Sequence, residues 1–131
     1  MTTNNHLLEE IKLYFNNRDA EQGAAIFATK ETITTLVPLS NISDKPITSF
    51  EIDFDELDAI VEEKEKDNLH LVGIIHSHIY DGPNPSKEDV NFFRNFIKVN
   101  PDLSNIYFPI ISLRNDSFEM KWYQMQNNKK G

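Results

Sequence analysis

The chain has 131 residues, with 21 Asp and Glu against 13 Lys and Arg, four histidines and no cysteine. Its 39% of hydrophobic residues indicates a packed core, and its charge of -8 argues against nucleic acid as the main partner. The lack of cysteine excludes disulfides, Cys-based zinc fingers and thiol catalysis, so histidines and carboxylates must hold any metal.

The chain also lacks the signals of a secreted or membrane protein. Its first residues do not follow the basic-then-apolar order of a signal peptide, and its apolar runs are too short to cross a bilayer. We therefore expect a cytoplasmic protein with no membrane partner. We expect one domain over residues 1–131, with frayed ends at 1–5 and 126–131.

Hydrophobic periodicity predicts three helices and six strands. In chain order, they are a helix at 6–17, strands at 24–28, 33–39 and 48–52, a helix at 53–67, a buried strand at 69–76, a helix from Ser86 to about residue 99, and strands at 106–113 and 117–123. Pro109 requires an edge or a bulge in the strand at 106–113. The order predicts an α/β fold, a single-domain α-β-α sandwich whose mixed sheet is flanked by helices.

Two histidines lie where the buried strand is predicted to end. His76 and His78 are two residues apart, so on an extended chain both imidazoles point to the same face. Ser86 opens the following helix and Asp89 lies in its first turn. Two imidazoles and one carboxylate, with a fourth position open to water, are typical ligands of a catalytic zinc ion.

These residues carry a resemblance to a known family. His76-Ser77-His78, seven residues, Ser86, two residues and Asp89 match the H-x-H-x7-S-x2-D motif of the JAMM metalloproteases, the JAB1/MPN domain, in its prokaryotic branch. The resemblance implies a cytidine-deaminase-like fold and one Zn²⁺ with a bound water, held by His76, His78 and Asp89.

The resemblance also implies the roles of two further residues. The family needs an upstream glutamate as general base; Glu21 is similar to it in position, directly before an apolar strand, and Glu31 is the alternative. Ser86 would donate a hydrogen bond to the developing oxyanion. The chain departs from the family at Ile79-Tyr80, where a proline usually follows the second histidine, and this affects the substrate-facing loop more than the metal ligands.

The implied function is a zinc-dependent (iso)peptidase. It would remove a ubiquitin-like modifier from its conjugates or process its C-terminus, in a bacterial conjugation or antiphage system with E1-like and E2-like partner enzymes. The alternatives are a peptidase that processes a sulfur-carrier protein, a non-catalytic MPN scaffold, a phage-type tail or cell-wall peptidase, and a DNA-repair relative.

Each signal also has a purely structural interpretation. Buried histidines are often hydrogen-bonded core residues, and Ser86 with Asp89 is also the pattern of a helix capping box. The sequence assigns no role to His6 or His70. The acidic run at 51–67 is interpreted as the solvated side of a helix, with a docking surface for a basic partner as the alternative.

Overall fold

The computed structural model describes residues 2–103 and 105–125, which form three α-helices, a 3₁₀ turn and one sheet. In chain order, the elements are β1 (Thr2–Thr3), α1 (Asn5–Tyr14), β2 (Gly23–Thr29), β3 (Thr32–Leu39), α2 (Phe54–Glu65), β4 (His70–His78), α3 (Lys87–Val99), β5 (Ile106–Tyr107), β6 (Ile110–Ser112), η1 (Arg114–Asp116), β7 (Glu119–Lys121) and β8 (Gln124–Met125). No helix in this part of the chain is long and apolar enough to span a bilayer.

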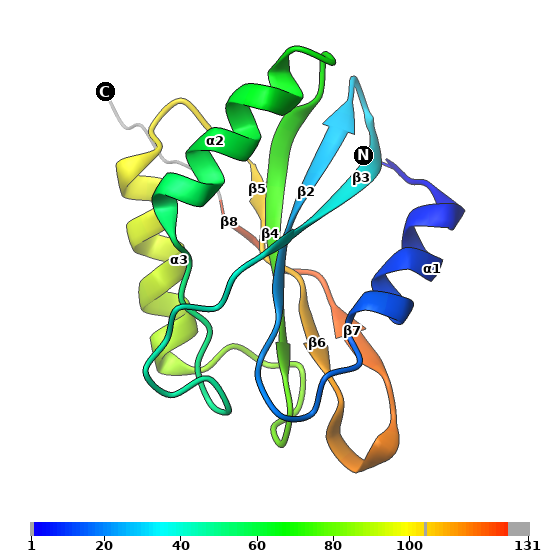
Figure 1. The fold of residues 1–131 in the computed structure, drawn as a ribbon, viewed down its shortest axis with the longest axis vertical. Helices are drawn as coiled ribbons and strands as arrows, with labels where there is room; N and C mark the ends of the chain where they lie inside the picture. The colour runs from blue at the N-terminus through cyan, green and yellow to red at the C-terminus, as the bar shows by residue number, and fades with distance from the viewer. Residues whose placement is uncertain (1, 104, 126–131) are drawn as a thin grey trace.

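The sheet lies between two layers of helix, as predicted. Helix α1 packs on one face, and α2 and α3 cover the other (Figure 1). Each face has its own hydrophobic cluster, one around Leu7 and Ile11 of α1 and one around Phe93 and Phe96 of α3. The predicted α-β-α sandwich is therefore confirmed.

The sheet topology brings two distant segments together at one end. The strands run in the order β1-β3-β2-β4-β5-β8, with β6 also paired to β4 and β7 paired to β6. Strand β2 is antiparallel to β4, with Gly23 opposite His76. The start of β2 therefore lies beside the end of β4, and residues just before β2 can reach the histidines (Figure 1).

Helix α3 begins at a complete capping box. The Ser86 side chain accepts a hydrogen bond from the Asp89 amide, and the Asp89 side chain accepts one from the Ser86 amide. Phe93, Phe96 and Ile97 are buried on the inner side of the helix. The local pattern Ser-x-x-Asp followed by an apolar stripe thus fixes where the helix begins and how it faces the sheet.

The predicted strand at 48–52 is wrong. Thr48 lies in a turn closed by its amide and the Lys45 carbonyl, and only Ile52 makes an isolated bridge, with Asn41. Backbone groups of this loop hydrogen-bond to the Asn41 side chain, whereas those of a strand would bond to a neighbouring strand. The alternation of apolar residues reflects a loop that covers the core with one side.

The prediction for the N-terminal end of the chain also needs correction. Residues 1–5 are not frayed where the structure describes them, because Thr2 and Thr3 pair in parallel with β3 and Asn4 caps α1. Helix α1 ends at Tyr14, earlier than predicted, and its Leu8 side chain is exposed. The predicted frayed tail at 126–131 lies outside the described residues.

The last two predicted strands are shorter in the structure. Strands β5 and β6 replace the strand at 106–113 and are separated by Phe108 and Pro109. Proline has no amide hydrogen to donate, so the ladder is interrupted there. The strand at 117–123 is shortened to β7, and β8 lies beyond its predicted end.

Candidate metal centre

The two motif histidines meet at the buried end of β4. His76 and His78 are 2% and 6% exposed, and both belong to the strand, so the two-residue spacing places them on one face. Their Nε2 atoms are 3.3 Å apart. Two buried imidazoles thus present the same ring nitrogen to one point.

Asp89 reaches that point from the first turn of α3. Its Oδ1 lies 3.2 Å from Nε2 of His76, and its Oδ2 lies 2.9 Å from Nε2 of His78. Burial opposes ionisation of Asp89, but its contacts with the two histidines outweigh burial and hold the pKa of the carboxyl well below its ordinary value. Asp89 is therefore a stable anion that serves the capping box and the histidine pair at once.

These distances can be tested against a metal. Donors that share a tetrahedral zinc ion at about 2.0–2.1 Å lie about 3.3 Å from one another. The two Nε2 atoms are 3.3 Å apart, and the Asp89 carboxylate lies 3.2 Å from that of His76 through Oδ1 and 2.9 Å from that of His78 through Oδ2. The donor set fits a single ion, and two neutral imidazoles with one carboxylate are the donors expected for a catalytic zinc ion.

Glu21 is a fourth group at this point. The carboxylate is 5% exposed, and one of its oxygens lies within 4.8 Å of a ring nitrogen of each histidine. Glu21, His76 and His78 thus form a second possible metal-binding group. Glu21 thus lies within reach of the point where the two imidazoles and the Asp89 carboxylate meet.

Burial controls the protonation of Glu21. Loss of hydration raises the pKa of Glu21 to about 8; His78 acts in the opposite direction, and the charge of Asp89 reinforces the rise. A buried acid with a pKa near neutrality is the kind of group that can exchange a proton at physiological pH. The alternative, Glu31, is exposed in the hairpin between β2 and β3, at the opposite end of β2.

The backbone at Glu21 is held firmly. The Glu21 amide donates to the carbonyl of Pro46, and the next residue, Gln22, exchanges two hydrogen bonds with Ser77 between the two histidines. The Asn41 side chain donates to the Glu21 carbonyl at 3.0 Å. Glu21 is thus fixed both to β4 and to the loop at 40–53.

Ser86 lies next to this centre as the N-cap of α3 and is exposed. Among the described residues its Oγ makes one hydrogen bond, as the acceptor from the Asp89 amide at 3.0 Å. The hydroxyl hydrogen is left to donate elsewhere. Capping and donation to a substrate are therefore compatible.

A tight loop fixes the ring of His78. The Gly82 carbonyl accepts from Nδ1 of His78 at 2.9 Å, which places the ring hydrogen on Nδ1 and leaves the Nε2 lone pair for a metal. The loop is fastened by the Ser112 hydroxyl to the Asp81 carbonyl at 2.6 Å and by the Tyr123 hydroxyl to the Pro83 carbonyl at 2.8 Å. Burial lowers the pKa of His78, but Asp89 and Gly82 outweigh it, so the net shift is upward.

The family departure at Ile79-Tyr80 lies in this same loop. Ile79 is buried, whereas Tyr80 is 69% exposed. The loop therefore packs Ile79 into the core and exposes the Tyr80 ring to solvent.

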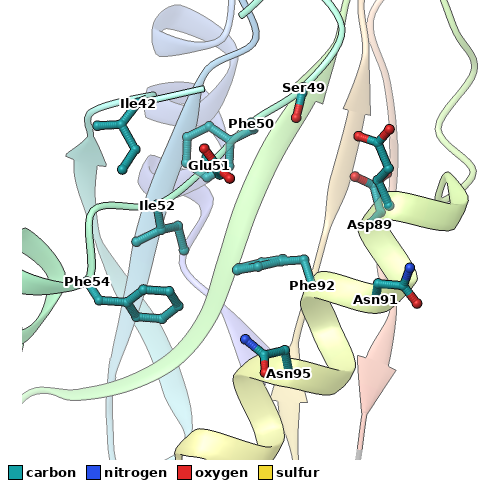
Figure 2. A pocket seen from close by; sticks show the side chains of 11 residues that line it. Ile42, Ser49, Phe50, Glu51, Ile52, Phe54, Asp89, Asn91, Phe92 and Asn95 are labelled. Carbon is teal, nitrogen blue, oxygen red and sulfur yellow. The ribbon is translucent and has the colours of Figure 1, made fainter. Parts of the chain in front are cut away.

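A groove of about 490 Å³ leads away from Asp89 (Figure 2). One wall is the loop from β3 to α2, and the other is the side of α3 that faces this loop. Apolar side chains and a smaller number of acids and amides line it: Ile42, Phe50, Ile52, Phe54 and Phe92, with Ser49, Glu51, Glu88, Asp89, Asn91 and Asn95. Asp89 and Phe50 are part of this lining, so the groove borders the candidate metal centre.

The other two histidines are far from the centre. His6 is exposed on α1 beside Glu10, and His70 begins β4 at the opposite end from His76. Sequence reasoning missed Asn41 and Phe50, two residues of the 40–53 loop that contact the site. The turn-forming composition of 41–46 was visible, but it does not reveal which distant groups the loop contacts.

The chain is similar to known proteins of one family. A family model described as prokaryotic homologs of the JAB domain matches residues 5–123. A desampylase from Pyrococcus furiosus is 32% identical over 85 residues, which are 65% of this chain and 60% of that protein. A probable TtuB-protein conjugate cleaving protease from Thermus thermophilus is 27% identical over 84 residues, 64% of this chain and 57% of that protein. The chain thus matches less than two thirds of the length of these relatives.

Two solved structures share the fold. A protein from Desulfitobacterium hafniense, known from a solution structure, has a TM-score of 0.71 at 22% identity, over 95% of this chain and 84% of its own. A JAB1/MPN domain protein from Archaeoglobus fulgidus, known from a crystal structure, has a TM-score of 0.57 at 20% identity, over 94% and 87%. At these identities the likeness concerns the fold alone.

Proposed function

The chain belongs to the family of prokaryotic homologs of the JAB domain, and from this membership and its site we propose a zinc-dependent peptidase that cleaves ubiquitin-like modifiers from their conjugates. The observation that carries the proposal is the convergence of Nε2 of His76, Nε2 of His78 and the Asp89 carboxylate, with the buried Glu21 alongside. A scaffold module has no need to bury four such groups together.

His76, His78 and Asp89 would hold the ion. A zinc ion in such a site lowers the pKa of water to about 7 and polarises a carbonyl group. The Gly82 carbonyl keeps the proton of His78 on Nδ1, away from the ligand atom. Asp89 remains ionised without the metal, so it needs no deprotonation before binding.

Glu21 would move the protons of the reaction. Its carboxylate takes a proton from the attacking water and returns it to the nitrogen of the departing amine. Burial raises the pKa of Glu21 to about 8, and a cation bound beside it would lower that pKa, since the charge favours the carboxylate. The carboxylate would then be an effective base at neutral pH.

Ser86 would stabilise the negative charge on the substrate oxygen. Its hydroxyl hydrogen is free while its oxygen caps α3, and the cap fixes where the side chain stands. One preorganised donor of this kind lowers the barrier by about 3 kcal/mol.

The groove supports a peptide tail as the substrate. Its apolar lining and its amides on α3 suit an extended chain, and Glu51 and Glu88 favour basic side chains on it. The names of the two relatives point to ubiquitin-like conjugates as well. We expect the modifier to be a ubiquitin-like or sulfur-carrier protein of the same cell, attached by E1-like and E2-like enzymes.

A mass-resolved cleavage assay tests this function. Zinc-loaded protein is incubated with candidate modifiers joined through a C-terminal Gly-Gly either to a lysine side chain or to a linear peptide. The expected product is the modifier with a free C-terminal carboxylate. Faster cleavage of the lysine-linked substrate would indicate an isopeptidase, and faster cleavage of the linear one would indicate C-terminal processing. Cleavage that survives chelation would reject the metal mechanism, and zinc binding without cleavage of any candidate would favour a scaffold.

A further inference from the structure

The ring of His76 lacks the support that His78 has. Among the described residues, the hydrogen bond and ion pair of the His76 ring both involve Nε2, the atom that faces Asp89. His78, in contrast, is also held through Nδ1 by the Gly82 carbonyl. A metal-binding imidazole is usually oriented through the nitrogen that does not bind the metal. No hydrogen bond between described residues fixes the His76 ring at Nδ1, so the residues packed against the ring bear on its orientation.

An aromatic ring lies against it. The rings of Phe50 and His76 are nearly parallel, with centroids 6.1 Å apart and an interplanar angle of 11°. Phe93 contacts the same imidazole edge-on, with centroids 6.3 Å apart. Phe93 belongs to the packed core of α3, whereas Phe50 comes from the loop that forms one wall of the groove.

The space for Phe50 exists because residue 23 is glycine. A Cβ at Gly23 would lie 1.9 Å from Cζ of Phe50, far inside contact distance. Gly23 is the residue opposite His76 in the β2–β4 ladder. The missing side chain on one strand thus admits the ring that covers the histidine on the next strand.

We propose that Phe50 is a positioning residue for His76, and that Gly23 provides the space that lets its ring stack on this imidazole. The inference rests on the proposed function, because it treats His76 as a zinc ligand. It adds that the wall of the substrate groove also sets how tightly the protein holds its metal.

The test is a double-mutant cycle read by zinc affinity, measured by competition with a chromophoric chelator. Phe50→Leu keeps an apolar side chain but removes the ring, and should weaken zinc binding about tenfold. Gly23→Ala should have a similar effect by displacing the ring. In the double variant the second change should add little, because both remove one interaction. The matched control is Phe54→Leu, a groove phenylalanine that stacks on Phe96, and its affinity should stay unchanged.

A Phe50→Leu protein that binds zinc like the wild type would overturn the proposal, and so would losses that multiply fully in the double variant. If Gly23→Ala does not fold, the comparison of Phe50→Leu with Phe54→Leu decides the question. A second readout uses the metal-free protein, where Phe50→Leu should move the ring proton resonances of His76 and leave those of His70 in place. Unmoved His76 resonances would contradict the stacking. Failure of the proposed function is separate, since it would appear as a wild-type protein without zinc affinity or cleavage.

Discussion

His78 and His76 lie two residues apart on β4, yet the two loops that support them use different interactions. The loop at 79–85 is short and holds His78 by a hydrogen bond from ring nitrogen to backbone carbonyl. The loop at 40–53 is longer, presents the Phe50 ring to His76, and is tied to Glu21 by the Asn41 side chain. The second loop also lines the groove, so it contacts both the groove and the candidate metal centre.

Asp89 contacts both His76 and His78, so substitution of Asp89 should have the largest effect on zinc binding. Asp89→Asn keeps an oxygen that can accept from the Ser86 amide and thereby retains the cap, but it removes the anionic ligand. We expect the purified variant to lose most of its zinc by elemental analysis while its helix content is kept. Glu88→Gln, one residue earlier on α3 and exposed, is the matched control and should keep its zinc. Full zinc content in Asp89→Asn would leave Glu21 as the third ligand.

A change at Glu21, which the longer loop holds through Asn41, separates proton transfer from metal binding. Glu21→Gln should keep zinc and lose about 10² to 10⁴ in kcat, because general acid–base catalysis contributes that much. Glu31→Gln, at the far end of β2, should behave like the wild type. Undiminished turnover by Glu21→Gln would reject its assignment as the base.

Ser86 tests whether the capping residue also acts on the substrate. Ser86→Ala should cost about 1 kcal/mol of stability through the lost cap and about a hundredfold in kcat through the lost donor. Ser86→Thr retains a hydroxyl and should recover most of both. A stability loss with unchanged kcat would reduce Ser86 to a helix cap.

Asn41 sharpens the comparison, because it ties the longer loop to Glu21. Asn41→Asp keeps the acceptor for the Ser43 and Glu51 amides but loses the donor to the carbonyls of Glu21 and Ser49. We expect kcat to fall about tenfold with zinc content unchanged, since a small displacement of a catalytic group is costly. Asn16→Asp, which loses a bond to Leu13 at the end of α1, is the control. An unchanged kcat in Asn41→Asp would show that this bond does not position Glu21.

Ser112 tests the shorter loop, and its effect should be the smallest. Ser112→Ala removes the bond to the Asp81 carbonyl and should cost about 1 kcal/mol in stability. We expect zinc affinity to weaken a few-fold, as the Gly82 carbonyl becomes less fixed on His78. Ser117→Ala, which loses an exposed bond to the Arg114 carbonyl, should not change zinc affinity. An unchanged affinity in Ser112→Ala would show that the loop holds His78 without this anchor.

The sequence predicts the part of the site whose geometry is local. The spacing of His76 and His78 on a strand, and of Ser86 and Asp89 on a helix start, specifies where each side chain points. The structure places all four together, with Glu21 brought in by the antiparallel pairing of β2 and β4. Their chemical roles stay predictions.

What the sequence did not predict depends on contacts between distant residues. Phe50 lies 26 positions from His76, and its place follows from the shape of a loop that the Asn41 side chain organises. The alternation of apolar and polar residues at 48–52 is typical of a strand. It indicates which side of the chain is buried, but not which backbone groups the chain hydrogen-bonds to. The break at Pro109 has the same explanation. The sequence shows that Pro109 has no amide hydrogen, but not which strands the segments on either side of it pair with.

The most direct test of the account is an anomalous-scattering map at the zinc edge from crystals grown with zinc. The account predicts one peak within bonding distance of Nε2 of His76, Nε2 of His78 and the Asp89 carboxylate, with Glu21 near it but not bound. A peak bonded to Glu21 and both histidines while Asp89 stays apart, or no peak at this end of β4, would contradict it.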